Sequence, residues 1–224
     1  MCGVPFHSAE GYITRLVSKG YKVAICEQVE DPKLAKGLVK REVVRIDTPG
    51  TNCNLEALDE SKNNYLMGVV AMDDLFGISV VDVTTGEYRL TEVDGLGKLL
   101  DEINKFMPSE LICNESFYIS GVDVEDLKER LGISISSLAP HYFDQECCKK
   151  SLCRHFSVQT LDGLGLADYS VGITAAGAVM EYLEETQKPS LAHILELIPY
   201  KVGKYMLLDR NTRRNLELVE TLRE

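Results

Sequence analysis

Three strand-like runs joined by short turns occupy residues 64–93, and they constrain the fold more than any other stretch. The run Tyr65–Met72 is apolar along both of its faces, which is typical of a central strand that is covered on both sides. Residues 78–84 are rich in β-branched side chains, and residues 88–93 alternate from one face to the other. Because turn residues separate the runs, at Asp73 and Asp74 and again at Thr85 and Gly86, the sequence predicts a three-stranded antiparallel meander.

After the meander the pattern changes to helices that alternate with short strands. Apolar side chains at helical spacing and helix-capping residues predict four helices, at residues 95–106, 124–131, 145–155 and 171–186. Gly132 is expected to close the second helix, and Asp144 to cap the third. Two short runs predict further strands, at residues 110–113 and 133–136. The last helix carries a packing stripe with small residues that allow close approach to a sheet: Ala175, Ala176, Val179, Tyr182 and Leu183. We therefore expect an α/β domain with a mixed five-stranded sheet and flanking helices.

The first 52 residues carry fewer elements. A helix is predicted from Ser8, a candidate N-cap, to Gly20, a residue type that often follows a last turn. Residues 21–27 are predicted as a buried strand and residues 41–47 as a second strand, which the turn residues 48–51 end. One helix and two strands bury little apolar surface alone. We therefore expect residues 1–52 to be a partial α/β domain whose first half is missing.

Composition excludes some classes of protein. The chain is 45% apolar and 26% charged, and no apolar run approaches the roughly 18 residues that a membrane span needs. The first residues lack the basic start and the apolar core of a signal peptide. Seven cysteines at irregular spacing, in a chain long enough to bury a core, are typical of reduced thiols. We therefore expect a cytoplasmic protein.

The net charge of −11 is unevenly distributed. Residues 1–52 carry 8 Lys and Arg against 6 Asp and Glu, whereas residues 63–187 carry 8 against 21. Phosphate neutralisation supplies most of the non-specific affinity of proteins for nucleic acids. A DNA contact is therefore expected within residues 1–52, and protein contacts are expected in the acidic middle.

Three long runs carry a family resemblance: GVPFHSAEGYITRLVSKGYKVAICEQVEDP at residues 3–32, KGLVKREVVRIDTPGT at residues 36–51 and YMLLDRNTRRNLELVET at residues 205–221. The first two resemble the C-terminal half of the mismatch-recognition domain in the MutS family of bacterial DNA mismatch repair proteins. The third resembles the entry into the lever domain of that family. Such long runs are far more specific than a single short motif.

The resemblance covers essentially the whole chain and implies its domain organisation. Residues 1–52 would be the C-terminal half of the mismatch-recognition domain, and residues 53–62 a linker. Residues 63–187 would be the connector domain, with an RNase H-like layout, and residues 188–224 a linker and the start of the lever. The resemblance also implies a parent protein that works as a dimer.

Two family motifs are absent from the sequence. The family reads mismatches with a Phe-x-Glu motif, whose Phe wedges into the base stack, and none of the six Phe residues here is followed two residues later by Glu. The phosphate-binding pattern G-x-x-x-x-G-K-[ST] of the family's ATPase domain is also absent. We therefore expect an internal fragment with no catalytic site and no cofactor of its own, cut from a parent that uses ATP and Mg²⁺.

The resemblance implies a structural and interaction module. The connector would join mismatch recognition to the lever and ATPase parts and would contribute to docking of MutL, while residues 1–52 would contact duplex DNA in the parent. One alternative is a metal-dependent nuclease on an RNase H-like fold. A further alternative is weak, salt-sensitive DNA binding by these residues alone, with no preference for mismatches.

Few single residues stand out as candidates for a site. His7 and Arg15 are the candidate DNA contacts, because in the family this segment lies against the DNA. A zinc site is considered and not favoured, since the clustered residues share no Cys-x-x-Cys pair and point to different helix faces: Cys147, Cys148, Cys153 and His155. A nuclease would need Mg²⁺ bound by carboxylates around the meander, where solvated charges are the simpler interpretation: Asp73, Asp74, Asp82, Glu87 and Asp94.

Overall fold

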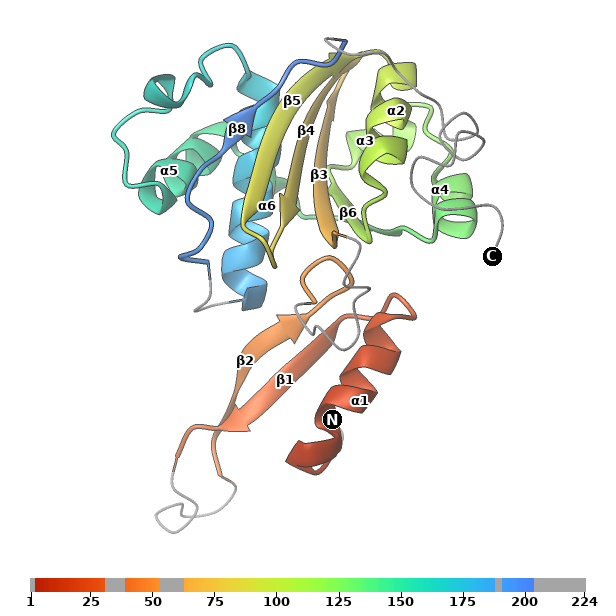
Figure 1. Ribbon diagram of the computed structural model, residues 1–224, viewed down its shortest axis with the longest axis vertical. Coiled ribbons are helices and arrows are strands. Elements are labelled where there is room, and N and C mark those ends of the chain that lie inside the picture. The colour runs from red at the N-terminus through yellow and green to blue at the C-terminus, as the bar shows by residue number, and fades with distance from the viewer. Residues whose placement is uncertain (1–2, 31–38, 53–62, 188–190, 204–224) are drawn as a thin grey trace, which may run out of the picture.

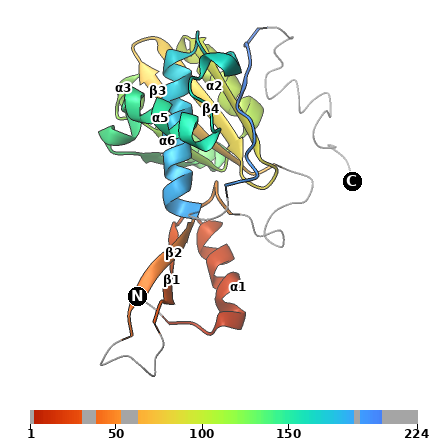
Figure 2. The ribbon, with the colours of Figure 1, turned by 90° about the vertical axis from the view of Figure 1, so that its left-hand side faces the viewer.

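The computed structural model describes residues 3–30, 39–52, 63–187 and 191–203. Within these residues the strands form two sheets, one of two strands and one of six (Figure 1). The two-stranded sheet and its helix belong to the N-terminal segment, and they lie beyond one end of the larger sheet (Figures 1 and 2). The helices of the described part are too short or too polar to cross a membrane.

The large sheet is built around the predicted meander. Strands β3 (Tyr65–Met72), β4 (Leu75–Asp82) and β5 (Glu87–Asp94) pair antiparallel, and six of the eight residues of β3 are buried. Strands β6 (Glu110–Cys113) and β7 (Ser134–Ser137) continue the sheet on the other side of β3, in parallel orientation. The sheet is therefore mixed, as predicted.

The expectation of five strands was one strand short. The chain returns after its last long helix and adds β8 (Ile198–Pro199), parallel to β5, so that the order is β7-β6-β3-β4-β5-β8. Two residues carry no periodicity that a sequence pattern could reveal, and only the pairing with Arg89 and Leu90 defines the strand. Strands β3 to β7 of the large sheet follow the RNase H-like order, with the meander at one side and the two parallel strands at the other.

Helices cover both faces of the sheet (Figure 1). One face carries α2 (Leu96–Phe106), α3 (Ser116–Ile119) and α4 (Val124–Leu131), and the other carries α5 (Gln145–His155) and α6 (Ser170–Gln187). The two cores contain alternate residues of β3, since Leu66 packs on the α6 side and Met67 on the α2 side. This double burial explains why β3 is apolar at successive positions.

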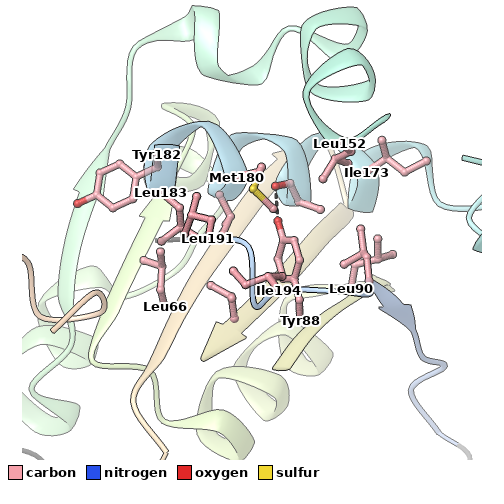
Figure 3. Packing of buried hydrophobic residues seen from close by; sticks show 14 of the residues in the cluster. Leu66, Tyr88, Leu90, Leu152, Ile173, Met180, Tyr182, Leu183, Leu191 and Ile194 are labelled. Carbon is pink, nitrogen blue, oxygen red and sulfur yellow. Dashed lines mark hydrogen bonds between the residues drawn. The ribbon is translucent and has the colours of Figure 1, made fainter. Parts of the chain in front are cut away.

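The packing of α6 depends on small residues, as the sequence predicts. All five residues of the predicted stripe are buried, and Gly77 of β4 lies directly against the backbone of Val171 and Gly172. Beneath the helix, the buried Tyr88 donates a hydrogen bond from its hydroxyl to the carbonyl oxygen of Ala176, at 2.5 Å (Figure 3). Burial raises the pKa of Tyr88 well above its usual value, so the side chain stays a neutral donor.

Several predicted helix ends are confirmed. Asp144 accepts a hydrogen bond from the backbone N–H of Cys147 at 2.8 Å and so begins α5. Gly132, at φ +69°, ends α4. Two elements of the predicted organisation, the linker 53–62 and the lever segment from 204 onward, lie outside the described residues.

The N-terminal segment contains α1 (Phe6–Val17), β1 (Val23–Gln28) and β2 (Arg41–Asp47). Ser8 is not the N-cap that the sequence suggested, because the helix begins earlier and Pro5 caps it, while Ser8 bonds back to the Pro5 carbonyl. The expectation of a buried strand over residues 21–27 was also wrong, since most of β1 is exposed. A two-stranded sheet with one helix has too few neighbours to bury both faces of a strand.

Candidate functional site at the junction of the two sheets

Glu110 lies where the N-terminal segment meets the large sheet. It is the first residue of β6, and its side chain is completely buried. A buried carboxylate is costly unless hydrogen bonds and a cation compensate the lost water. The surroundings of Glu110 therefore show which groups hold the junction together.

Four donors from three separate stretches of chain converge on this carboxylate. Oε2 accepts from the hydroxyl of Thr48 at 2.5 Å and from the backbone N–H of Gly50 at 3.1 Å. Oε1 accepts from the hydroxyl of Tyr182 at 2.7 Å and forms an ion pair with Nζ of Lys22 at 3.1 Å. Three of these donors, from Thr48, Gly50 and Lys22, belong to the N-terminal segment, whereas Tyr182 belongs to α6.

The turn after β2 is shaped to present its donors. The hydroxyl groups of Thr48 and Thr51 lie 2.8 Å apart, and the backbone N–H of Thr48 donates to the hydroxyl of Thr51 at 3.1 Å. Gly50 packs so closely that a Cβ atom at this position would lie 2.8 Å from Cβ of Glu110 and 3.0 Å from Cβ of Leu66. Any side chain at position 50 would therefore push the turn away from the sheet.

Lys22 and Tyr182 also contact each other. Nζ of Lys22 lies 4.9 Å from the centroid of the Tyr182 ring, within the range of a cation–π contact, and the lysine side chain keeps 35% of its surface exposed. Burial, and then the negative charge of Glu110, raise the pKa of Tyr182 far above its usual value. Tyr182 is therefore a permanent donor to Glu110.

Further polar contacts surround this centre. The amide of Gln187, at the end of α6, donates to the carbonyl oxygen of Ile46 at 3.2 Å. The amide of Asn64 donates to the carbonyl oxygens of Pro49 and Asn52, at 3.0 and 3.2 Å. Side-chain amides of the sheet domain thus hold the backbone of the N-terminal segment on both sides of its turn.

A cavity of about 280 Å³ adjoins the junction. Its lining includes Val17 of α1, Pro49 of the turn and Met107 at the end of α2. The C-terminal end of α1 therefore does not pack closely on the sheet domain. The N-terminal segment contacts the sheet domain at the polar centre around Glu110 and where β2 meets α6.

The two predicted DNA-contacting residues lie away from this junction. His7 and Arg15 both belong to α1 and are exposed, and Arg15 lies in the last turn of the helix. Eight residues separate them, so they are about 12 Å apart along the helix axis. The structure places them on one exposed helix and does not bring either of them to Glu110.

Three of the residues considered for metal binding serve other contacts. Cys148 is buried against Gly177 of α6, and the ring of His155 contacts the carbonyl oxygen of Ile194 at 2.9 Å. Oδ1 of Asp82 accepts from the backbone N–H and the hydroxyl of Thr84, at 2.8 and 2.6 Å, and so stabilises the β4–β5 turn. In the described ranges, no three His, Cys, Asp or Glu side chains are placed to hold a metal ion together.

Sequence reasoning missed Glu110, Lys22 and Thr48 as a group. Their separations along the chain are large, and no local pattern connects them. One signal was present, because a charged residue opens a strand that is otherwise apolar and buried. Such a residue needs partners, but their identity depends on the tertiary fold.

Comparisons with known proteins agree on a family. The model of MutS domain I matches residues 1–56, and that of MutS domain II matches residues 64–195. Relatives described as DNA mismatch repair protein MutS include one from Lachnoclostridium phytofermentans, 60% identical over 224 residues, and one from Ruminiclostridium cellulolyticum, 48% identical over 227. Each match covers the whole of this chain, which spans about a quarter of its relatives, 24% and 26% respectively.

A solved structure of T. thermophilus RuvC in complex with Holliday junction substrate is also similar, with a TM-score of 0.39 and 13% identity. The similarity covers 57% of this chain and 98% of that one.

Proposed function

Because the chain belongs to the MutS family of DNA mismatch repair proteins, we propose that residues 63–187 are the connector of a mismatch repair protein. In this role they join a mismatch-recognition part, of which residues 1–52 form the C-terminal half, to the lever and ATPase parts. The segment from residue 188 onward leads into the lever. These residues carry no catalytic site or cofactor of their own in this proposal, and the parent protein uses ATP and Mg²⁺ elsewhere.

The observation that carries the proposal is the position of the sheet domain between two attachments. The N-terminal segment is fixed at β6 through Glu110. The outgoing chain runs along the opposite side of the sheet, where β8 pairs with β5 and the Tyr200 hydroxyl donates to Glu102 at 2.6 Å. A rigid sheet held at both sides can transmit a displacement from one neighbour to the other.

The sheet domain is also proposed to dock MutL. Its charge supports a protein partner, since residues 63–187 carry a net charge of −13 and would repel phosphate. Residues 1–52 carry +2 and would face duplex DNA, with His7 and Arg15 exposed on α1 as contacts. The parent protein is proposed to be a cytoplasmic dimer.

Calorimetric titration of the whole chain tests the two partners together. MutL from the same organism is titrated in one series, and matched and mismatched DNA duplexes are titrated in another. The proposal expects binding of MutL, and weak DNA binding that falls with salt and does not distinguish the two duplexes. Tight DNA binding without MutL binding would move the function to residues 1–52, and clear mismatch discrimination would show that a Phe-x-Glu motif is not needed.

A metal-dependent nuclease remains the second candidate, favoured by the RNase H-like strand order. It would need Asp82 to bind Mg²⁺, although its Oδ1 already accepts two hydrogen bonds from Thr84 and its Oδ2, buried in the described structure, has no hydrogen-bond partner. Incubation of the chain with labelled duplex and single-stranded DNA, with Mg²⁺ or Mn²⁺, tests it directly. Metal-dependent cleavage that Asp82→Asn abolishes would establish the nuclease.

A further inference from the structure

The groups that donate hydrogen bonds to Glu110 belong to two parts of the chain, and only one of these sets would move away with the N-terminal segment. Lys22, Thr48 and Gly50 would leave with the segment, whereas Tyr182 would stay on α6. We propose that Glu110 is the positioning residue of a reversible latch, which fixes the N-terminal segment on the sheet domain when closed and stays partnered by Tyr182 when open. The latch goes beyond the proposed connector role and does not depend on MutL docking.

The closed state is geometrically specific. The carboxylate receives charge-assisted hydrogen bonds, which are shorter and stronger than neutral ones, and each donor approaches a defined oxygen. Lys22 supplies the compensating positive charge. Gly50 adds a steric condition, since the turn reaches Glu110 only without a Cβ atom at that position.

The open state avoids the main penalty of a broken buried ion pair. A buried charge that loses its partner inside a protein is strongly destabilising, because nothing replaces the lost interaction. Here the partners lie on the segment that would move, so its departure would uncover Glu110 and let water replace Lys22, Thr48 and Gly50. The surrounding contacts from Gln187 and Asn64 are polar and are replaceable by water in the same way.

The packing beside the latch is consistent with such a movement. The cavity of about 280 Å³ separates the end of α1 from the end of α2. An interface held by an extensive apolar surface would have to expose that surface to open, at a cost proportional to its area. The latch concentrates the attachment in one polar centre, and it can therefore open and close without unfolding either part.

Single-molecule energy transfer measures the latch directly. Donor and acceptor dyes are attached through unnatural amino acids at Arg41, in exposed β2, and Glu129, on exposed α4, so that the native cysteines are left unchanged. The whole chain is studied without DNA or MutL. The wild type is expected to show one narrow closed population.

Glu110→Gln removes the charge with little change of shape. Its loss of charge-assisted bonds is expected to raise the ratio of open to closed molecules roughly tenfold or more. Lys22→Met is expected to raise the same ratio because it removes the cation. Gly50→Ala is expected to raise it because the added Cβ atom pushes the turn away from Glu110. Lys22→Met leaves the sheet domain's own residues unchanged, so the test remains decisive if Glu110→Gln impairs folding.

Glu102→Gln is the matched control. Glu102 is also a buried carboxylate that accepts from a tyrosine and a lysine, Tyr200 and Lys105, but all three lie within residues 63–203. This variant is expected to leave the population closed. An unchanged distribution in both Lys22→Met and Glu110→Gln, or an equal change in Glu102→Gln, would overturn the latch, whatever the outcome with MutL.

Discussion

Substitution of Gly77 by Ala tests the close packing of α6 on the sheet. A Cβ atom at position 77 would collide with the carbonyl group of Val171 and lie 2.7 Å from the backbone nitrogen of Gly172. Ordinary contact begins near 3.4 Å, so the contact with Gly172 alone requires the start of α6 to move by about 0.7 Å, and the closer carbonyl group of Val171 requires more. The obstacle is backbone, and no side-chain rotation can relieve it.

The expected magnitude has two parts. Overpacking of a dense core costs about 1–3 kcal/mol. The same movement strains the hydrogen bonds that Oε1 of Glu92 accepts from Val171 and Gly172, at 2.7 and 2.9 Å, and weakening of such a bond costs about 1 kcal/mol. We therefore expect Gly77→Ala to lower the free energy of unfolding by about 3 kcal/mol, which corresponds to a Tm lower by roughly 6–12 °C in a chain of this size.

Gly97→Ala is the matched control. Gly97 lies in α2, and a Cβ atom there would meet nothing within 4 Å. Both variants restrict the unfolded chain equally, by about 0.4–1 kcal/mol, so their difference isolates the collision at α6. Urea unfolding followed by far-ultraviolet circular dichroism measures both variants. If Gly77→Ala is as stable as Gly97→Ala, the close approach of α6 to β4 is wrong.

Three further predictions concern charge and reactivity. Backbone N–H groups at the start of α5 lower the pKa of Asp144, so its carboxylate stabilises the folded state. This contribution, which Asp144→Ala removes, should be fully present above about pH 4 and should be lost as the pH falls through the pKa of the folded state. Unfolding of the wild type and the variant from pH 7 to pH 2 measures it. Arg15→Ala should reduce the slope of log affinity for duplex DNA against log salt by about one, whereas Lys98→Ala, on the acidic domain, should leave it unchanged. Cys147 is exposed whereas Cys148 is buried, and burial raises the pKa of Cys148 to about 12, so iodoacetamide followed by mass spectrometry should find Cys147 modified before Cys148 in the folded chain.

The order of the longer elements in residues 64–187 was predictable from local patterns, whereas the one-turn helix α3 was not predicted. β-Branched runs defined the meander, apolar residues at helical spacing defined α2 and α6, and Asp144 and Gly132 marked helix ends. The errors arose where the tertiary structure decides whether a strand is exposed and with which strand it pairs. The exposure of β1 depends on how few elements cover it, and β8 depends on a pairing across more than 100 residues of chain.

The candidate site was predictable only in part. Arg15 was placed on a helix by the pattern of residues 8–20, whereas His7 was expected just before that helix and lies in the first turn of α1; their contact with DNA stays a prediction. Glu110 was assigned to a short strand, but its donors come from positions as far apart as Lys22 and Tyr182. Such a convergence follows from topology, which sequence spacing does not express.

The return of the chain along β5 also protects the sheet. An edge strand of a sheet presents unpaired backbone N–H and C=O groups, with which a strand of another molecule can pair. Here β8 pairs with Arg89 and Leu90, Thr91 donates to the carbonyl oxygen of Tyr200 at 2.6 Å, and the ring of His193 contacts the carbonyl oxygen of Val83 at 2.6 Å. Residues 191–203 therefore also shield this edge of the sheet, and a chain that ended at residue 187 would leave β5 open to self-association.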